Sequence, residues 1–284
     1  QLAELLLGEC PVLGGKADGF VGKLTPNGQT LMQSTYIGTN NYDQAFFVEI
    51  NRNDEIFVLG QSVGGNFPVI NSQSYPGSSQ FIAKLNPGLT SILNSTVFGN
   101  GSPDINISPS AFLVDICGNM YVSGWGGSVL AGSPPVGGLP VSPDAYQGTS
   151  PNGFDFYLFV YKRDFSGLLY GSYLGDPTIK LSGARAQEHV DGGTSRFDKN
   201  GVVYQSVCGG CGGFTNFPTT ADAWATDNPN IGSGNRCNNV VFKFDFQLLP
   251  KAEFEADNVA GCEDFTVTLT NTSSSSDSYE WDFG

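Results

Sequence analysis

Short apolar segments separated by turns recur in a fixed order along most of the chain. One recurring pair consists of a strand that ends in lysine, a turn, and a second strand that ends in glycine. Its copies lie at 19–24 with 34–38, at 80–85 with 95–99 and at 158–162 with 171–175, and its first half recurs at 240–243. The segments are rich in β-branched and aromatic residues, so each of them is predicted to be a β-strand.

A second recurring pair alternates with the first. Each copy has two apolar segments across a polar turn, at 45–50 with 56–60, at 111–115 with 120–124 and at 195–198 with 202–206. The turns include Gly118-Asn119 and Asn200-Gly201. An Asn-Gly pair between apolar segments predicts a tight hairpin in which both turn residues adopt positive φ.

Each hairpin is followed by a glycine-rich loop with an apolar residue before proline and then an aromatic residue. These are Phe67-Pro68 with Tyr75, Leu139-Pro140 with Tyr146, and Phe217-Pro218 with Trp224. The repeating unit therefore has four strands: the hairpin supplies the first and second, and the lysine-ending pair supplies the third and fourth. One such sheet cannot bury both faces, so the units are expected to stack as four-stranded antiparallel blades of a β-propeller.

The repeats divide the chain into two regions, and the predicted fold class is all-β. Residues 1–249 are predicted to be a β-propeller repeat region with three nearly complete blades plus a partial one, in which 5–8 would be a second strand. The propeller in this chain is partial because a closed one needs at least four blades. In the region 250–284, residues 251–256 are predicted to be an edge strand and 265–271 a half-buried strand of a truncated second domain.

Composition and charge mainly exclude two classes of partner, nucleic acids and membranes. Of the 284 residues 14% are charged, and the net charge is −14. Nucleic-acid binding needs a basic surface, so no nucleic-acid partner is expected. No apolar run approaches the roughly 18 residues of a membrane span, so no membrane insertion is expected, and a targeting segment would lie upstream. The acidic surface could attract Ca²⁺ as a counterion, and no other cofactor is expected.

The recurring segments resemble the bacterial seven-bladed β-propeller repeats known as SBBP repeats, over about residues 17–246. The closest stretches are 34–38, 80–88, 114–124 and 216–220. The third unit departs most, because it has Val207-Cys208 where the second has Gly124-Trp125.

Two further segments extend this resemblance. Residues 208–213, with 217–220 and 237–239, look like a version of the repeat found in large surface proteins of Bacteroidota, and Trp281-Asp282-Phe283-Gly284 resembles the hallmark of an immunoglobulin-like PKD domain. Such proteins often carry a sorting region for type IX secretion. The resemblance therefore implies an exported, extracellular or cell-surface protein connected with gliding motility or adhesion. Its partners would be other domains of the same large protein or other surface proteins.

The chain contains six cysteines, and in an exported protein disulfides are the default. Cys208 and Cys211 follow the second strand of the last unit and Cys237 precedes its third strand, so we expect Cys237 to pair with Cys208 or Cys211. Cys117 lies in a hairpin turn at the opposite end of a blade. The Cys208-x-x-Cys211 spacing also fits a zinc knuckle, and free or redox-active thiols are a further alternative. The single histidine, His189, precedes a first strand, so no metal site is predicted.

Two groups of residues could carry chemistry. Glu188, His189 and Asp191 form a short cluster, which we interpret as a solvated strand entry. Four carboxylates recur near first strands, and paired carboxylates could hydrolyse glycosides, but we expect them to cap turns; they are Asp43, Asp104, Asp115 and Asp198. No catalytic residue is therefore predicted, and the chain is not expected to be an enzyme.

Three aromatic residues on or beside the long loops form a candidate ligand-binding rim: Trp125, Tyr146 and Trp224. They could stack on sugar rings or anchor the loops, and anchoring is the favoured interpretation. The expected function is that of a non-enzymatic, structural or adhesive cell-surface protein. The alternatives are a propeller that binds a glycan or a protein partner and, ranked last, an enzyme that degrades polysaccharide.

Overall fold

The structure is a computed structural model that describes residues 5–12, 16–64, 67–126, 136–190, 195–228, 237–248, 252–257, 266–273 and 280–282. Every regular element within these ranges is a β-strand, so the all-β prediction is confirmed. No helix in the described ranges has the length and apolar character needed to cross a membrane. The strands form four antiparallel sheets, here called sheets I to IV, and a separate two-stranded hairpin.

Each sheet is a meander in which strand order follows the chain. The predicted four-stranded antiparallel unit is confirmed for sheets II and III, and the described parts of sheets I and IV have three strands each. Sheet I contains β1 (Leu5–Val12), β2 (Lys16–Leu24) and β3 (Leu31–Ile37). Sheet II contains β4 (Asp43–Ile50), β5 (Ile56–Ser62), β6 (Gln80–Leu85) and β7 (Ile92–Phe98). Sheet III contains β8 (Ile107–Val114), β9 (Met120–Gly126), β10 (Phe156–Tyr161) and β11 (Leu168–Leu174). Sheet IV contains β12 (Arg196–Phe197), β13 (Val202–Gly209) and β14 (Asn238–Asp245).

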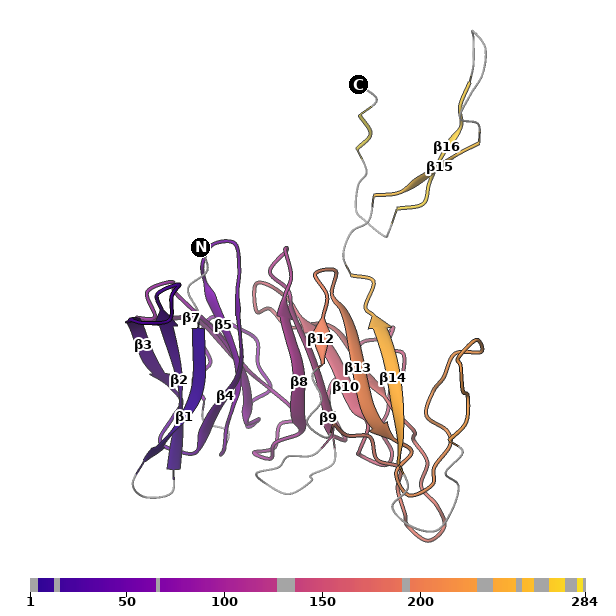
Figure 1. Cartoon of the computed structure of the whole chain (residues 1–284), viewed down its shortest axis with the longest axis horizontal. Coiled ribbons are helices and arrows are strands. Elements are labelled where there is room, and N and C mark those ends of the chain that lie inside the picture. The colour runs from indigo at the N-terminus through magenta and orange to yellow at the C-terminus, as the bar shows by residue number, and fades with distance from the viewer. Residues whose placement is uncertain are drawn as a thin grey trace.

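The four sheets stand face to face in a row, with sheet I at one end and sheet IV at the other (Figure 1). Apolar side chains fill each of the three interfaces between neighbouring sheets. The strands in the middle of sheets II and III are consequently buried on both faces, and β5 and β10 are buried at every position. This explains why the sequence shows continuous apolar segments there instead of strict alternation.

Neighbouring sheets approach one another through their first strands. Strand β8 contacts both β4 and β12, and β4 also contacts β1 and β2 of sheet I. The fourth strands, β7 and β11, form the opposite edges of their sheets. The first strands therefore share one side of the row and the fourth strands lie away from it.

The β8–β9 and β12–β13 turns are each closed by an aspartate side chain and one left-handed glycine. In the β12–β13 turn, Asp198 Oδ1 accepts hydrogen bonds from the backbone N–H groups of Asn200 (2.8 Å) and Val202 (3.0 Å). Gly201 alone has a positive φ there, of 77°, and its N–H donates to the carbonyl of Asp198 (3.1 Å). The prediction of positive φ at both Asn200 and Gly201 is therefore wrong, because the Asp198 side chain stabilises a longer turn that needs only one left-handed residue.

The loop between the second and third strands runs along the fourth strand in both complete sheets. In sheet II the backbones of Ile70 and Ser95 exchange two hydrogen bonds of 3.0 Å each. In sheet III the N–H of Ser142 donates to the carbonyl of Gly171 (3.0 Å). The loop thereby covers the outer edge of the fourth strand, which would otherwise present unpaired backbone groups.

The C-terminal hairpin stands apart from the row of sheets (Figure 1). It pairs β15 (Phe254–Ala256) with β16 (Leu269–Asn271). Both strands are shorter than the predicted 251–256 and 265–271, and most of their residues are exposed. Of the predicted hallmark, the ring of Trp281 contacts Phe254 with a centroid separation of 5.6 Å, and Phe283 and Gly284 lie outside the described residues.

Candidate functional site: a cysteine–histidine cluster beside an open groove

The hairpin geometry of sheet IV brings the single histidine to the cysteines. His189 and Cys208 exchange two backbone hydrogen bonds, from His189 N–H to the Cys208 carbonyl (3.2 Å) and from Cys208 N–H to the His189 carbonyl (2.9 Å). In an antiparallel hairpin, the start of one strand lies beside the end of the next. A residue before β12 therefore lies at the end of β13. The position of His189 before a first strand thus brings it to the cysteines, and the inference that this position separates it from them is wrong.

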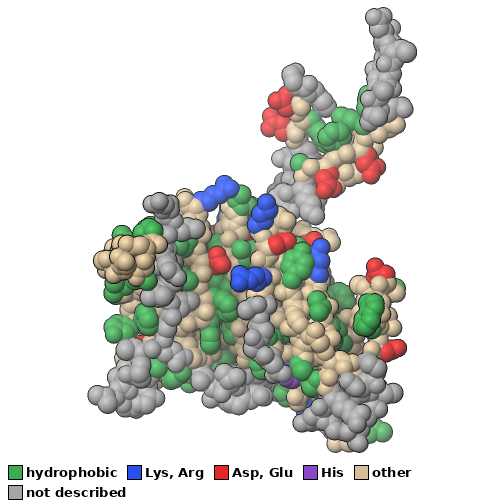
Figure 2. All heavy atoms as spheres, in the orientation of Figure 1, with side chains coloured by type: hydrophobic (Ala, Val, Ile, Leu, Met, Phe, Trp, Pro, Cys, Tyr) green, Lys and Arg blue, Asp and Glu red, His purple; other side chains and the backbone are tan. Residues whose placement is uncertain are grey.

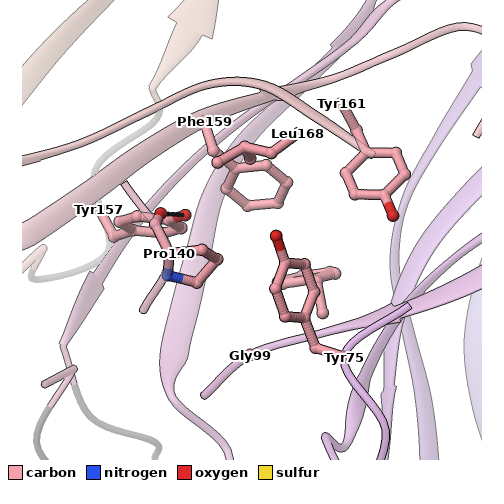
Figure 3. Close-up of a pocket in the computed structure, with 8 residues that line it drawn as sticks. Tyr75, Gly99, Pro140, Tyr157, Phe159, Tyr161 and Leu168 are labelled. Carbon is pink, nitrogen blue, oxygen red and sulfur yellow. Dashed lines mark hydrogen bonds between the residues drawn. The ribbon is translucent and has the colours of Figure 1, made fainter. Parts of the chain in front are cut away.

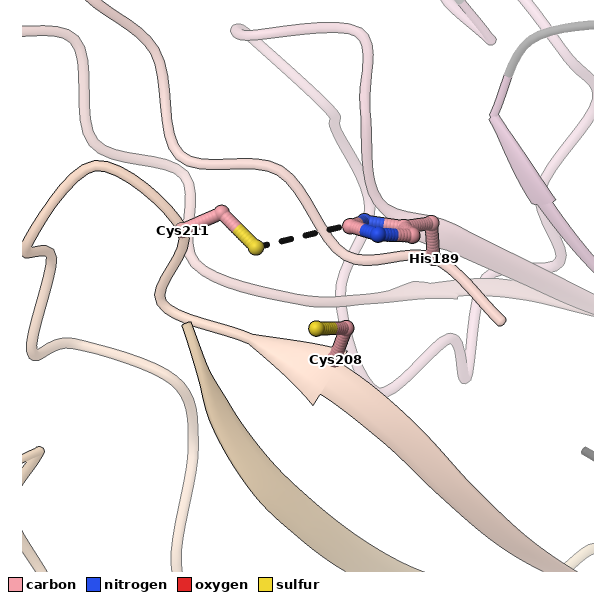
Figure 4. A group of neighbouring side chains, drawn as sticks. All are labelled: His189, Cys208 and Cys211. Atoms are coloured by element: carbon pink, nitrogen blue, oxygen red, sulfur yellow. Dashed lines mark hydrogen bonds between the residues drawn. The ribbon is translucent and has the colours of Figure 1, made fainter. Parts of the chain in front are cut away.

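The side chains of His189, Cys208 and Cys211 converge. Their ligand atoms, one ring nitrogen and two sulfurs, all lie within 4.8 Å of one another. Cys211 Sγ is 4.0 Å from His189 Nδ1, and Figure 4 shows the three side chains facing a common point. This arrangement of soft sulfur and imidazole ligands is the type that zinc prefers.

Glycines shape the loop that follows Cys208. Gly210, Gly212 and Gly213 have positive φ values of 65°, 87° and 74°. A Cβ atom at Gly210 would also lie 2.5 Å from the carbonyl oxygen of Phe214. The loop therefore depends on glycine for both its backbone conformation and its close contact with Phe214.

One disulfide closes this end of the sheet. It joins Cys211 to Cys237, which are 26 residues apart, so Cys237 pairs with one of the two partners left open by the sequence. Cys208 lies outside this bond. Cys117 is exposed in the β8–β9 turn, and Cys262 lies outside the described residues.

Three buried carboxylates, those of Glu188, Asp155 and Asp176, lie near one another, and Glu188 directly precedes His189 in the chain. Glu188 is only 1% exposed, so the interpretation of this residue as a solvated strand entry is wrong, and Asp191 lies outside the described residues. Burial, together with the negative charges of the nearby Asp155 and Asp176, raises the pKa of Glu188 to about 9. Burial likewise raises the pKa of Asp155 to about 6. Glu188 is therefore protonated at neutral pH.

The recurring aspartates serve local structure. Asp198 caps the β12–β13 turn, and Asp115 caps the β8–β9 turn by accepting the N–H of Asn119 (2.8 Å), as predicted. Asp43 is buried at the start of β4 and accepts the N–H of Thr39 (2.6 Å). Asp104 is exposed and accepts a hydrogen bond from Ser102 (3.2 Å).

An open groove of about 1030 Å³ lies beside the cluster, along β14. Residues 214–228, in the long loop of sheet IV, form its other wall, and Tyr146 from sheet III lies at its side. Tyr146 and Trp224, two of the predicted rim residues, both line this groove, and the Trp224 side chain is fully exposed. Trp125 does not line it, and its ring lies 6.0 Å from that of His189 instead.

The groove occupies the position that a fourth strand fills in sheets II and III. There, the long loop packs against the fourth strand; in sheet IV, no described strand lies on the outer side of β14. The loop is nevertheless anchored as in sheet II, where Phe67 stacks on Phe81 with a 3.8 Å centroid separation. In sheet IV the rings of Phe217 and Phe242 are near-parallel at 6.5 Å. Anchoring by the apolar residue before proline is thus seen in both sheets.

A much smaller cavity lies at the interface between sheets II and III. Figure 3 shows Tyr75, Tyr157 and Phe159 closing around a small cavity. Its volume is about 10 Å³, which holds no more than about one water molecule. The hydroxyl of Tyr157 donates to the carbonyl of Pro140 there. This cavity is therefore too small for a ligand, whereas the groove is open to one.

On the face that Figure 2 shows, the Lys and Arg side chains gather along the upper part of the row of sheets, with acidic side chains between them. Lys84 and Glu55 form an ion pair at 3.6 Å, with both side chains partly buried.

The sequence matches no protein-family model, and no curated protein shows significant similarity to it. The interpretation of the site therefore rests on its geometry and on the internal repeats of the chain.

Proposed function

We propose that this chain is a non-enzymatic module of a large extracellular or cell-surface protein, and that it serves adhesion or surface assembly by binding an extended strand in the groove beside β14. The sheets would be blades of a β-propeller, and the C-terminal hairpin would begin a PKD-type domain. The resemblance to the surface repeats of Bacteroidota supports the extracellular setting. The open groove in place of a fourth strand carries the proposal.

The arrangement of the sheets supports the propeller. Blades of a propeller are four-stranded antiparallel meanders packed face to face, with the first strand of each nearest the common axis. Sheets II and III have this strand order, and the first strands β4, β8 and β12 contact one another in turn.

The edge of β14 is suited to pairing with another strand. An unpaired edge presents a row of N–H and C=O groups that an extended peptide can hydrogen-bond. Strand β14 is eight residues long, and its Phe242 and Phe244 side chains are half-buried along the groove. Backbone hydrogen bonds would provide affinity, and these aromatic side chains would select the residues of the incoming strand.

The repeats show which sequence such a strand would have. The last strands of sheets I to III, which are β3, β7 and β11, end in similar segments at 34–38, 95–99 and 171–175. Each segment contains two small or hydroxyl residues, then a β-branched or aromatic residue, an apolar residue and glycine. The occupant is therefore a segment of this type, supplied by another domain of the same large protein or by another surface protein.

The buried carboxylates support a non-enzymatic role. Glu188 and Asp155 are inaccessible to solvent, and Asp115 and Asp198 are engaged in turns. A glycosidase needs two carboxyl groups that both reach the substrate.

The test uses a fluorescent peptide with the sequence of residues 168–175, flanked by lysines for solubility, and measures its anisotropy with increasing protein. Saturable binding in the micromolar range is expected, with none for a scrambled peptide. Trp224→Ala should weaken binding at least fivefold, whereas Met32→Ala, an exposed residue of sheet I, should have no effect.

Two other outcomes would overturn the proposal. Binding to a glycan array that Trp224→Ala abolishes, without peptide binding, would identify a glycan-binding module. Hydrolysis of a polysaccharide by the protein would identify an enzyme.

A further inference from the structure

We propose that, in the reduced protein, Cys208, Cys211, Cys237 and His189 form a tetrahedral site that binds one zinc ion. This inference does not depend on the proposed strand binding. It concerns cysteines for which the sequence patterns predict a disulfide and no metal site.

Three of the four ligands are already in place. The ligand atoms of His189, Cys208 and Cys211 lie within 4.8 Å of one another. In a tetrahedral site with Zn–S bonds of about 2.3 Å and Zn–N bonds of about 2.0 Å, a sulfur and a nitrogen ligand lie about 3.5 Å apart. Cys211 Sγ and His189 Nδ1 are 4.0 Å apart, so side-chain rotations that bring them closer together would complete the geometry.

The disulfide itself shows where the fourth ligand is. Cys237 Sγ is bonded to Cys211 Sγ, so it lies next to one of the three ligand atoms. It is not part of the group whose ligand atoms all lie within 4.8 Å of one another, so its side chain would rotate toward them once the bond is reduced. When a dithiol reductant converts this bond to two thiols and is itself oxidised to a disulfide, both sulfurs become available. Zinc then binds three thiolates and a neutral imidazole, and the three thiol protons are released.

The backbone around the cluster suits a metal knuckle. Cys208 and Cys211 are separated by two glycines, and Gly210 has the positive φ that allows the chain to fold back between them. His189 is fixed by its two backbone hydrogen bonds to Cys208. The ligands therefore come from a rigid bridge between two segments, which reduces the entropy lost on binding.

The surroundings compensate the charge of such a site. Zinc with three thiolates and an imidazole carries one net negative charge. The ammonium group of Lys180 donates hydrogen bonds to the carbonyls of Gly212 (3.1 Å) and Gly213 (3.4 Å), directly after Cys211. This positive charge lies beside the loop that would hold the metal.

The function of the site would be structural. Four protein ligands leave no open position for a substrate. The disulfide links the segment just after β13 to the residue just before β14. The metal would also join the segment before β12, and would thereby hold the wall of the groove in place.

The test compares reduced and oxidised full-length chain under anaerobic conditions, after removal of excess metal. The reduced chain should retain about one zinc per chain, and cobalt(II) added instead should give the intense visible bands of tetrahedral thiolate coordination. The oxidised chain should retain none. Circular dichroism of the metal-free reduced chain checks that the sheets persist.

Matched variants identify the ligands. Cys208→Ser leaves the disulfide intact, so the oxidised variant should fold as the parent does, yet reduced it should bind zinc at least tenfold more weakly. His189→Ala should do the same and should alter the cobalt spectrum. Cys117→Ser, an exposed thiol in the β8–β9 turn, should change neither property.

The proposal is overturned if the reduced, folded chain binds no zinc, or if Cys208→Ser and His189→Ala bind it as tightly as the parent. A loss of zinc in Cys117→Ser equal to that in Cys208→Ser would also overturn it. If the reduced chain unfolds and zinc does not restore its circular dichroism, the site is a disulfide only.

Discussion

Gly201, in the β12–β13 turn, lies directly against the ring of Tyr121 in β9, so that a Cβ atom at Gly201 would be 2.8 Å from Tyr121 Cε1. Gly201 also has a positive φ of 77°. Gly201→Ala is therefore expected to destabilise the protein by about 2 to 4 kcal/mol, through left-handed backbone strain and overpacking together. Urea unfolding followed by circular dichroism measures this change.

The comparable turn of sheet III provides the control. Gly118 has a positive φ of 89°, but a Cβ atom there would meet only the Arg163 Cβ, at 3.3 Å. Gly118→Ala should therefore lower the free energy of unfolding by about 1 to 2 kcal/mol, mostly through left-handed backbone strain. Equal costs for the two variants would show that the contact with Tyr121 contributes nothing.

The corresponding turn of sheet II has a non-glycine residue at the left-handed position. Asp54 has a φ of 57°, and its N–H donates to the carbonyl of Asn51 (3.1 Å). We expect Asp54→Gly to be more stable than Asp54→Ala by about 1 kcal/mol, because alanine has a Cβ that disfavours this conformation. Thermal unfolding of the two variants side by side tests this, and an alanine variant as stable as the glycine variant would contradict it.

Much of the fold could be predicted from the order of apolar segments. The lysine-ending strands at 80–85 and 158–162 correspond to β6 and β10, and both lie within the predicted meanders. The ends of the strands were less predictable: β13 extends to Gly209, beyond the predicted 202–206, because its pairing with β14 continues to Asn238. Pairing of this kind depends on the partner strand, which local sequence does not reveal.

The candidate site was predicted only in part. The pairing of Cys237 with one of two cysteines followed from strand order, and Tyr146 and Trp224 lie at one groove. Sequence order alone made His189 appear distant, although a hairpin brings it to Cys208. The burial of Glu188 could not be foreseen either, because charged residues in a polar segment usually mark solvent-exposed chain.

The disulfide is expected to stabilise the oxidised protein substantially. It closes a loop of 26 residues between Cys211 and Cys237, for which the loop-entropy relation gives about 3 to 4 kcal/mol. Cys237→Ser should therefore lower the free energy of unfolding by this amount, measured in urea with a chelator present. Cys208→Ser, which leaves the disulfide intact, should not, and a similar loss in both variants would argue against this pairing.

Asp155 makes stability depend on pH. Burial raises its pKa to about 6 from 3.8, although hydrogen bonds from Ser150, Asn152 and Gln147 lower it. In the unfolded chain the carboxyl group ionises near pH 4, so between about pH 4 and 6 the unfolded state binds fewer protons than the folded state. The contribution of Asp155 to stability therefore falls as the pH rises through this window and is constant above it.

Asp155→Asn removes this dependence. Asparagine keeps an oxygen that can accept the hydrogen bond from Gln147 (2.9 Å to Oδ2 in the parent) and does not ionise. The stability of the variant relative to the parent should therefore rise from pH 4 to pH 6 and then level off, as measured by urea unfolding at intervals of half a pH unit. Asp164→Asn serves as a contrast, because Ser166 donates hydrogen bonds to that exposed carboxylate and lowers its pKa. The stability of this variant relative to the parent should fall, not rise, with increasing pH, and should do so at lower pH. A difference between Asp155→Asn and the parent that stays constant from pH 4 to 6 would mean that Asp155 ionises equally in the folded and unfolded states.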